Sequence, residues 1–175
     1  MITFQKIRWK NFLSTGDHWS EIDFLGHTTN LVVGTNGSGK STMLDALTFS
    51  LFNKPFRKIN KSQLINATNE KDCVVEVEFT VNNKDYLVRR SIKPNKFDIE
   101  VNGTLLHKES DDRLNQKILE ESILKVNYKS FTQIVILGSS SFVPFMQLST
   151  SNRRDVIEDL LCLLYTSPSP RDRVR

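Results

Sequence analysis

Apolar residues along this chain recur with two different periods, which divide it into predicted strands and predicted helices. Alternation of apolar and polar residues is typical of a half-buried strand, whereas apolar residues three and four positions apart indicate an amphipathic helix. Alternating segments and two continuous apolar runs predict strands at 2–9, 19–24, 29–33, 74–81, 86–91, 96–101, 104–106 and 133–137. Helical spacing predicts helices at 41–52, at 111–126 and from residue 150 onward.

The strands between residues 74 and 106 are predicted to form an antiparallel meander. Short turn sequences separate them, and Asn102-Gly103 is a strong signal for a two-residue type I′ hairpin. The charged residues that we expect to alternate along this sheet are Glu76, Glu78, Lys84 and Arg90. Such alternation predicts that one face of the sheet is in contact with water.

Each predicted helix carries an apolar stripe that we expect to face the interior. The stripes consist of Leu44, Leu47 and Leu51, of Leu114, Ile118 and Leu119, and of Val156, Ile157, Leu160 and Leu161. The last stripe is narrow and too short to distinguish core packing from the start of a coiled coil. The apolar run 133–137 lacks polar alternation, so it is predicted to be a fully buried strand.

A glycine-rich segment joins the apolar run 29–33 to the first predicted helix. Its sequence, Gly34-Thr35-Asn36-Gly37-Ser38-Gly39-Lys40-Ser41-Thr42, fits the pattern G-x-x-x-x-G-K-[ST] of a phosphate-binding loop. The strand before it and the helix after it are the flanking elements that this pattern requires. Four fixed positions and both flanking elements favour a phosphate loop over a chance glycine turn.

The residue types of this loop indicate how it binds a nucleotide. Glycines let backbone N–H groups converge on a phosphate, and the helix adds its positive N-terminus. Lys40, the only catalytic candidate, would neutralise the β- and γ-phosphates, and the Ser41 hydroxyl would coordinate Mg²⁺. The candidate nucleotide-binding residues are Gly34, Asn36, Gly37, Ser38, Gly39, Lys40, Ser41 and Thr42. Their pattern does not distinguish adenine from guanine.

The composition of the chain narrows the class of protein but does not indicate a function. The chain has 175 residues and a formal charge of +4, of which residues 162–175 contribute +2 through three arginines and one aspartate. A length of this kind predicts one domain, and no apolar run approaches the roughly 20 residues of a membrane helix. We therefore expect a cytoplasmic protein. The cysteines and histidines, which show neither disulfide nor metal-ligand spacing, are Cys73, Cys162, His18, His27 and His107.

The helical pattern that begins at residue 150 is interrupted after Leu161. Two prolines and an arginine-rich end follow within residues 162–175. We interpret 1–161 as the domain and 162–175 as a non-native tail, with a genuine disordered terminus as the alternative.

Further segments carry a resemblance to a known family. Lys10-Asn11-Phe12 precedes the phosphate loop, Met43-Leu44-Asp45-Ala46 continues it, and the antiparallel block follows. Up to about Leu161, the chain resembles the N-terminal half of SMC-like ATPases of the SbcC type. Residues 51–57, 63–66, 133–138 and 144–146 resemble more closely the large-subunit family of the recombination endonucleases of T-even-like phages.

The resemblance implies an α/β fold, the N-terminal lobe of an ABC/SMC-type P-loop NTPase head with an antiparallel meander and flanking helices. It implies ATP and Mg²⁺ as cofactors. The implied partners are the C-terminal half of the same ATPase, a second head in a homodimer, a nuclease subunit and double-stranded DNA, with no membrane, in the host cytoplasm if a phage encodes the chain. In this family the Walker B carboxylates and the signature motif belong to the C-terminal half, so we expect this lobe alone to be inactive.

Two sets of site residues also follow from the resemblance. The wider family carries a magnesium-binding glutamine in the loop after the strand equivalent to 133–137, but the loop here is Gly138-Ser139-Ser140-Ser141-Phe142. Ser139 is therefore a candidate second metal ligand. The family holds duplex DNA on its heads, which makes a basic cluster a candidate DNA contact: Arg89, Arg90, Lys93 and Lys96. A solvated charged face is the simpler interpretation of that cluster.

The sequence thus predicts the ATP-binding part of the ATPase subunit of a DNA recombination and double-strand-break repair nuclease complex. Two alternatives stay open. A RecF-like or ABC-type ATPase shares the phosphate loop, and a structural SMC-like clamp would have no nuclease partner.

Overall fold

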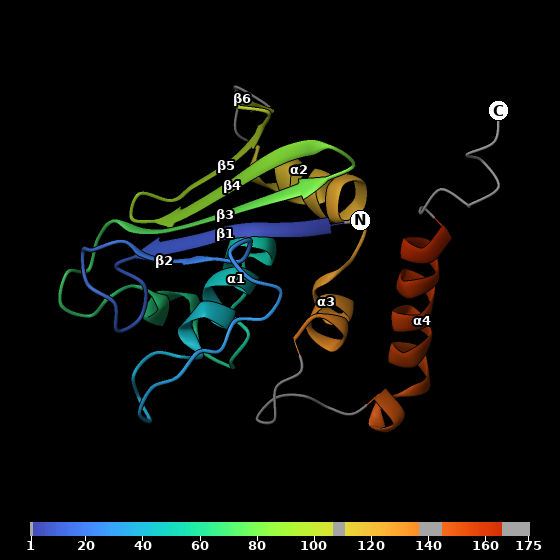
Figure 1. The fold of residues 1–175 in the computed structure, drawn as a ribbon, viewed down its shortest axis with the longest axis horizontal. Coiled ribbons are helices and arrows are strands. Elements are labelled where there is room, and N and C mark those ends of the chain that lie inside the picture. Colours follow the sequence, from blue (N-terminus) through green and yellow to red (C-terminus); the bar gives the residue numbers. More distant parts are fainter. Residues whose placement is uncertain (1, 107–110, 137–144, 166–175) are drawn as a thin grey trace.

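One antiparallel sheet forms the frame of the computed structural model, which describes residues 2–106, 111–136 and 145–165 (Figure 1). Its six strands lie in the order β2-β1-β3-β4-β5-β6. Their bounds are β1 (Ile2–Lys10), β2 (Ser20–Asp23), β3 (Cys73–Val81), β4 (Lys84–Ile92), β5 (Lys96–Val101) and β6 (Thr104–Leu105). The meander predicted between residues 74 and 106 is confirmed, and the first two predicted strands pair beside it.

The turns of the meander follow from its asparagines and glycine. Asn102 and Gly103 have φ values of 50° and 78°, the left-handed pair that a type I′ turn requires. Asn82 and Asn83, between β3 and β4, also have positive φ values, 50° and 61°. These tight turns fix the register, so Val77 stands opposite Val88 and Val88 opposite Ile99.

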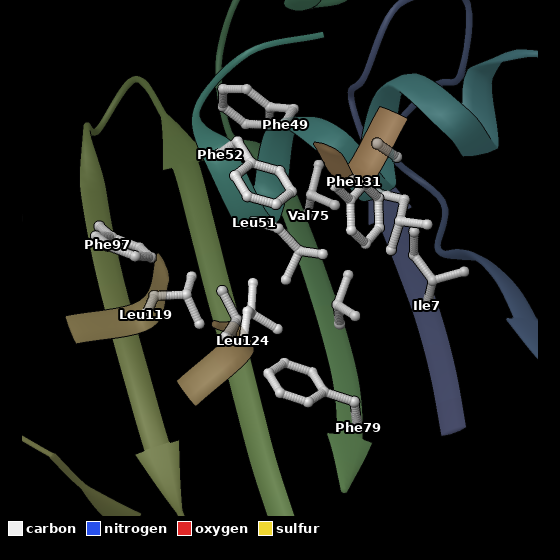
Figure 2. Packing of buried hydrophobic residues seen from close by; sticks show 14 of the residues in the cluster. Ile7, Phe49, Leu51, Phe52, Val75, Phe79, Phe97, Leu119, Leu124 and Phe131 are labelled. Atoms are coloured by element: carbon white, nitrogen blue, oxygen red, sulfur yellow. The ribbon is translucent and has the colours of Figure 1, made fainter. Parts of the chain in front are cut away.

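The inner face of the sheet packs against helices that bury its apolar side chains (Figure 2). The largest contributions come from aromatic rings, with Phe79 stacked on Tyr86 at 5.5 Å and Phe52 against Phe131 at 5.1 Å between ring centroids. The helices are α1 (Thr42–Phe52), η1 (Lys61–Leu64), α2 (Asp112–Lys117), the π-helical η2 (Ile118–Leu124), α3 (Tyr128–Ile134), η3 (Phe145–Gln147) and α4 (Thr150–Tyr165). Helix α1 contacts β3 and β4, which fixes its direction beneath the sheet.

Two charged residues of the meander are buried, although the alternation predicted both on a face in contact with water. Arg90 stands opposite Val75 on the inner face and is only 4% exposed, so its placement on a wet face was wrong. Glu76 lies on the outer face but is 3% exposed, because Arg8 and Arg89 bind its carboxylate from the two neighbouring strands. The outer face is therefore a paired, partly covered surface rather than a freely solvated one.

The helical stripes are confirmed in part. Leu47 and Leu51 of α1 and Leu119 of η2 are buried as expected. Leu114 is 47% exposed, because α2 is short and turns its Asn115 inward instead. In α4, Val156 is buried against α3, whereas Ile157 and Leu161 are 45% and 44% exposed.

Two predicted strands are wrong, one at 29–33 and the other, predicted to be fully buried, at 133–137. Residues 29–33 form no strand, and Leu31 and Val33 are 86% and 81% exposed. The segment 133–137 begins inside α3, and Leu137 lies outside the described residues. A strand of continuous apolar residues needs neighbouring strands and cover on both faces, and no described strand lies beside either segment.

Helix α4 continues through Cys162 to Tyr165, and residues 166–175 lie outside the described residues. The interpretation of 162–175 as a non-native tail, and of 1–161 as the domain, therefore stays a prediction.

Candidate nucleotide-binding site

The glycine-rich segment is a compact loop that ends at the first turn of α1. Gly37 and Gly39 have φ values of 87° and 91°, which side chains with a Cβ rarely adopt. A Cβ at Gly34 would lie 2.4 Å from the Ser38 hydroxyl oxygen, so the backbone can approach that side chain only without one. The Thr42 N–H donates to Gly39 O at 2.9 Å and starts the helix. The loop is therefore shaped by its glycines as the motif requires.

The Lys40 side chain lies over this loop. Its Nζ donates to Gly34 O at 2.6 Å and to Thr35 O at 2.8 Å. These carbonyls hold the ammonium group beside the loop, where it adds positive charge to the N-terminus of α1. The Ser41 residue precedes the helix and is exposed, so its hydroxyl is accessible to a ligand.

A hollow of about 500 Å³ opens beside the loop. Six of the predicted nucleotide-binding residues line it: Asn36, Gly37, Gly39, Lys40, Ser41 and Thr42. Gly34 and Ser38 are not among the residues that line it. The size of the hollow is in the usual range of roughly 300–1,000 Å³ for small-molecule sites.

The opposite wall of the hollow was not predicted as part of the site. It is lined by Leu13, Ser14, Arg57, Gln63, Ile65 and Ala67. The first two lie in the connection after β1 and the others in the connection between α1 and β3, at least fifteen positions away from the loop. No pattern in the sequence indicates that these connections fold against the loop. Only the resemblance to a known family at residues 10–12, 51–57 and 63–66 singled out these segments in the sequence.

Arg57 is fixed at the hollow by a buried carboxylate on α1. Asp45 has no exposed surface and accepts two hydrogen bonds, from Arg57 N at 2.9 Å and from Nε at 2.6 Å, and it forms an ion pair with Nη2 at 2.5 Å. The Arg57 side chain remains 43% exposed. The structure therefore gives the hollow a second cation in addition to Lys40.

The structure separates the four candidate DNA residues. Arg90 is buried with its guanidinium 3.6 Å above the Phe97 ring, and its Nε donates to Ser50 O at 3.0 Å. Burial lowers the pKa of Arg90 to about 9, although Asp112 and Glu120 raise it. Arg90 therefore cannot lie on a surface that contacts DNA.

The other three candidate DNA residues lie on the outer face or at its end. Arg89 is held by Glu76, and the hydrogen bond to that carboxylate raises the pKa of the Arg89 guanidinium. Lys93 and Lys96 are exposed around the turn between β4 and β5. These three residues remain a DNA hypothesis.

The metal candidates have different outcomes. Ser41 lines the hollow at the helix N-terminus, and a hydroxyl oxygen suits Mg²⁺. Ser139 lies outside the described residues. Within the described part of the chain, no group of three or more histidines, cysteines, aspartates or glutamates could hold a metal ion.

The loop, the helix it starts and the hollow beside them define a phosphate-loop nucleotide-binding domain. The sequence model of the AAA domain family matches residues 6–164, and the chain belongs to this family.

Two curated relatives and one solved structure give the closer likeness. Exonuclease subunit 2 of Enterobacteria phage T4 is 44% identical over 89% of this chain and 28% of its own length. The DNA double-strand break repair Rad50 ATPase of Methanococcus maripaludis is 32% identical over 90% of this chain and 15% of its own length. The chain thus spans less than a third of the relatives it matches.

The solved structure comes from work on ATP-driven dimerization and DNA-stimulated activation of SMC ATPases. It has a TM-score of 0.60 and 24% identity, and the match covers 90% of this chain and 99% of that chain. The expected fold class, the N-terminal lobe of an SMC-type P-loop ATPase head with an antiparallel sheet and flanking helices, is confirmed. Among the described helices, none combines the length and the apolar character that crossing a membrane requires.

Proposed function

We propose that the chain is the ATP-binding N-terminal part of the ATPase subunit of a nuclease complex for DNA recombination and double-strand-break repair. The observation that carries this proposal is the hollow beside a glycine-shaped phosphate loop at the start of α1. The names of the relatives support the wider role, since one is a subunit of an exonuclease and another a double-strand break repair ATPase.

The triphosphate would bind at the loop end of the hollow. Backbone N–H groups of residues 36–42 would hold the β-phosphate, and Lys40 would leave the carbonyls of Gly34 and Thr35 to neutralise the terminal phosphates. Ser41 would hold Mg²⁺, which neutralises charge on the phosphates when it is bound. Base and ribose would then occupy the opposite end, beside Ser14 and Ile65.

The rest of the ATPase site would come from the C-terminal half of the same protein. Leu31, Val32 and Val33 are apolar, lie immediately before the loop and are 86%, 45% and 81% exposed. An apolar run of this kind is a strand that lacks its neighbours, so we infer that the missing half supplies them. Alone, the chain would bind ATP weakly and not turn it over. Its catalytic acid would arrive with that half, and the signature loop with a second head.

DNA contact would involve the meander, but without Arg90. Lys93 and Lys96 are exposed at one end of β4 and β5, and Arg89 lies on the outer face of the same strand pair. Contacts of this kind bind phosphates and tolerate any sequence. The nuclease subunit and the cytoplasmic location belong to the same proposal.

The experiment compares ATP binding by Lys40→Ala with binding by Lys58→Ala, an exposed lysine that does not line the hollow. We expect Lys40→Ala to lose ATP binding and to keep its melting temperature, because the ammonium contacts loop carbonyls and not the core. Lys58→Ala should bind ATP normally. Unchanged affinity in Lys40→Ala would refute the assignment of the site.

A second variant tests the metal. Ser41→Ala should weaken ATP binding in Mg²⁺ more than in EDTA, because only the metal-bound complex uses the hydroxyl. Equal weakening under both conditions would remove the metal role. Co-purification of the full-length protein with a nuclease subunit distinguishes the repair complex from a structural clamp.

A further inference from the structure

Two buried asparagines form hydrogen bonds across the wall of the hollow that faces the phosphate loop, next to a backbone bridge between Phe12 and Ile65. Asn66 is 8% exposed, and its Nδ2 donates to Leu13 O at 3.2 Å and to Thr15 O at 3.0 Å. Its Oδ1 accepts from the N–H groups of Thr68 at 2.9 Å and Asn69 at 3.0 Å. One side chain thus ties the connection after β1 to the turn after residue 65.

Asn11 makes the reciprocal set of contacts. It is 1% exposed, and its backbone carbonyl accepts from Asn66 N at 2.9 Å. Its Oδ1 accepts from Asn69 Nδ2 at 2.6 Å, and its Nδ2 donates to Asp17 Oδ1 at 3.1 Å and to Asp72 O at 3.3 Å. Asn11 has a φ of 50°, a left-handed conformation that asparagine tolerates better than most residues.

These hydrogen bonds join two connections and not two strands of the sheet. Strand β1 is already held by its ladders to β2 and β3, which do not include residues 13–15 or 65–69. The two connections supply four residues that line the hollow: Leu13, Ser14, Ile65 and Ala67. The asparagine side chains therefore add to the backbone contacts of this wall, which include the hydrogen bond from Leu13 N to Leu64 O at 2.6 Å, and the sheet does not depend on them.

We propose that Asn66, together with Asn11, is a positioning residue that holds this wall for the nucleoside half of the bound nucleotide. The inference rests on the proposed function of the hollow. Leu13 and Ile65 are apolar and half-buried, which suits the flat face of a base, and Ser14 is an exposed hydroxyl beside them. Uncharged residues of this kind would contribute to binding of the base and ribose but not of the triphosphate.

The test uses the 175-residue chain and two ligands, ATP and inorganic tripolyphosphate. Asn66→Asp keeps an acceptor for Thr68 N and Asn69 N but loses the donor to Leu13 O and Thr15 O. We expect the dissociation constant for ATP to rise on the order of tenfold, because two buried hydrogen bonds are lost and two carbonyls are left unpaired. Binding of tripolyphosphate should stay unchanged, since the phosphate loop is not altered.

Asn152→Asp is the matched control, because it introduces the same change on α4, where the side chain accepts from Lys129 Nζ at 3.2 Å. This control variant should bind ATP and tripolyphosphate with the affinities of the unaltered chain. If Asn66→Asp weakens the binding of ATP and of tripolyphosphate equally, the positioning role is overturned. Unchanged affinity for ATP would overturn it as well. Failure of the proposed function gives a different result, in which Lys40→Ala leaves the binding of both ligands intact.

A second variant decides the question if Asn66→Asp does not fold. Asn69→Ala removes only the hydrogen bond to Asn11 Oδ1, and Asn69 is half-buried at the edge of the wall. We expect the affinity of this variant for ATP to fall by about threefold to tenfold and its affinity for tripolyphosphate to stay unchanged. A folded Asn69→Ala protein that binds both ligands like the unaltered chain would refute the proposal.

Discussion

The apolar residues of the meander are buried, whereas those of the segment that leads into the phosphate loop are exposed. In β3, Val75, Val77 and Phe79 have no exposed surface, because β1, β4 and the helices beneath supply every neighbour. At 29–33, a run of similar composition is largely exposed. An antiparallel hairpin brings its own partner through a tight turn, whereas a strand buried on both faces depends on elements from elsewhere. The meander thus supplies neighbours for its own strands, whereas the described chain supplies none for residues 29–33.

The largest expected effect contrasts Phe79→Ala with Leu31→Ala. Phe79 is fully buried and packs on Phe4 and Tyr86, so truncation should lower the free energy of unfolding by about 3–5 kcal/mol. Leu31 is 86% exposed, and its truncation should change that free energy by less than about 0.5 kcal/mol. Urea unfolding followed by circular dichroism measures both. Equal destabilisation would show that 29–33 packs in the isolated chain after all.

A smaller effect concerns Cys73 at the start of β3. Burial raises the pKa of this thiol to about 12 from 9.0, so the folded state keeps its proton where the unfolded state loses it. The stability from this group is therefore fully present below about pH 9 and is lost as the pH rises toward 12. The loss should reach up to about 4 kcal/mol.

The measurement is the slope of the unfolding free energy against pH between 9 and 12 in the unaltered chain and in Cys73→Ala. The variant should lack the part of the slope that comes from the thiol. Identical slopes in the two proteins, or fast labelling of Cys73 by a thiol reagent at pH 8, would show that the Cys73 thiol is not buried in the folded state.

Addition of the C-terminal half should change the phosphate-loop segment and leave the sheet unaltered. We expect backbone amides of 29–33 to exchange hydrogen at least about tenfold more slowly in its presence, whereas those of 75–79 stay as they are. Phosphate release should appear at the same time and disappear in Lys40→Ala. Turnover by the chain alone would show instead that its catalytic acid lies within these residues.

The smallest effect is expected at the exposed end of the meander. Reversal of charge in a Lys93→Glu, Lys96→Glu variant should weaken binding to duplex DNA and reduce the slope of log affinity against log salt by about two. Charge reversal at Lys117 and Lys125, which lie around η2 and outside the proposed surface, serves as the control. If both variants bind alike, Lys93 and Lys96 form only a solvated face.

Local sequence determined the parts of this protein whose causes are local. The turn at Asn102-Gly103 and the alternation in β3 are decided by neighbouring residues, so they could be predicted before any packing was known. The phosphate loop was predictable for the same reason. Its glycines, Lys40 and Ser41 lie within nine consecutive positions, so their spacing predicts a phosphate loop without any knowledge of packing.

Tertiary structure decided whatever depends on residues distant in the chain. Arg90 alternates like a surface residue, but its place opposite Val75 turns it toward Ser50 O and Phe97. The far wall of the hollow combines two connections that are distant in the chain. Asn11 and Asn66, fifty-five positions apart, join them by hydrogen bonds. Residues 29–33 have the pattern of a strand but form none, because the described chain offers no neighbouring strand to pair with them. Hydrogen bonds between distant segments are set by the fold as a whole, and spacing along the sequence carries no record of them.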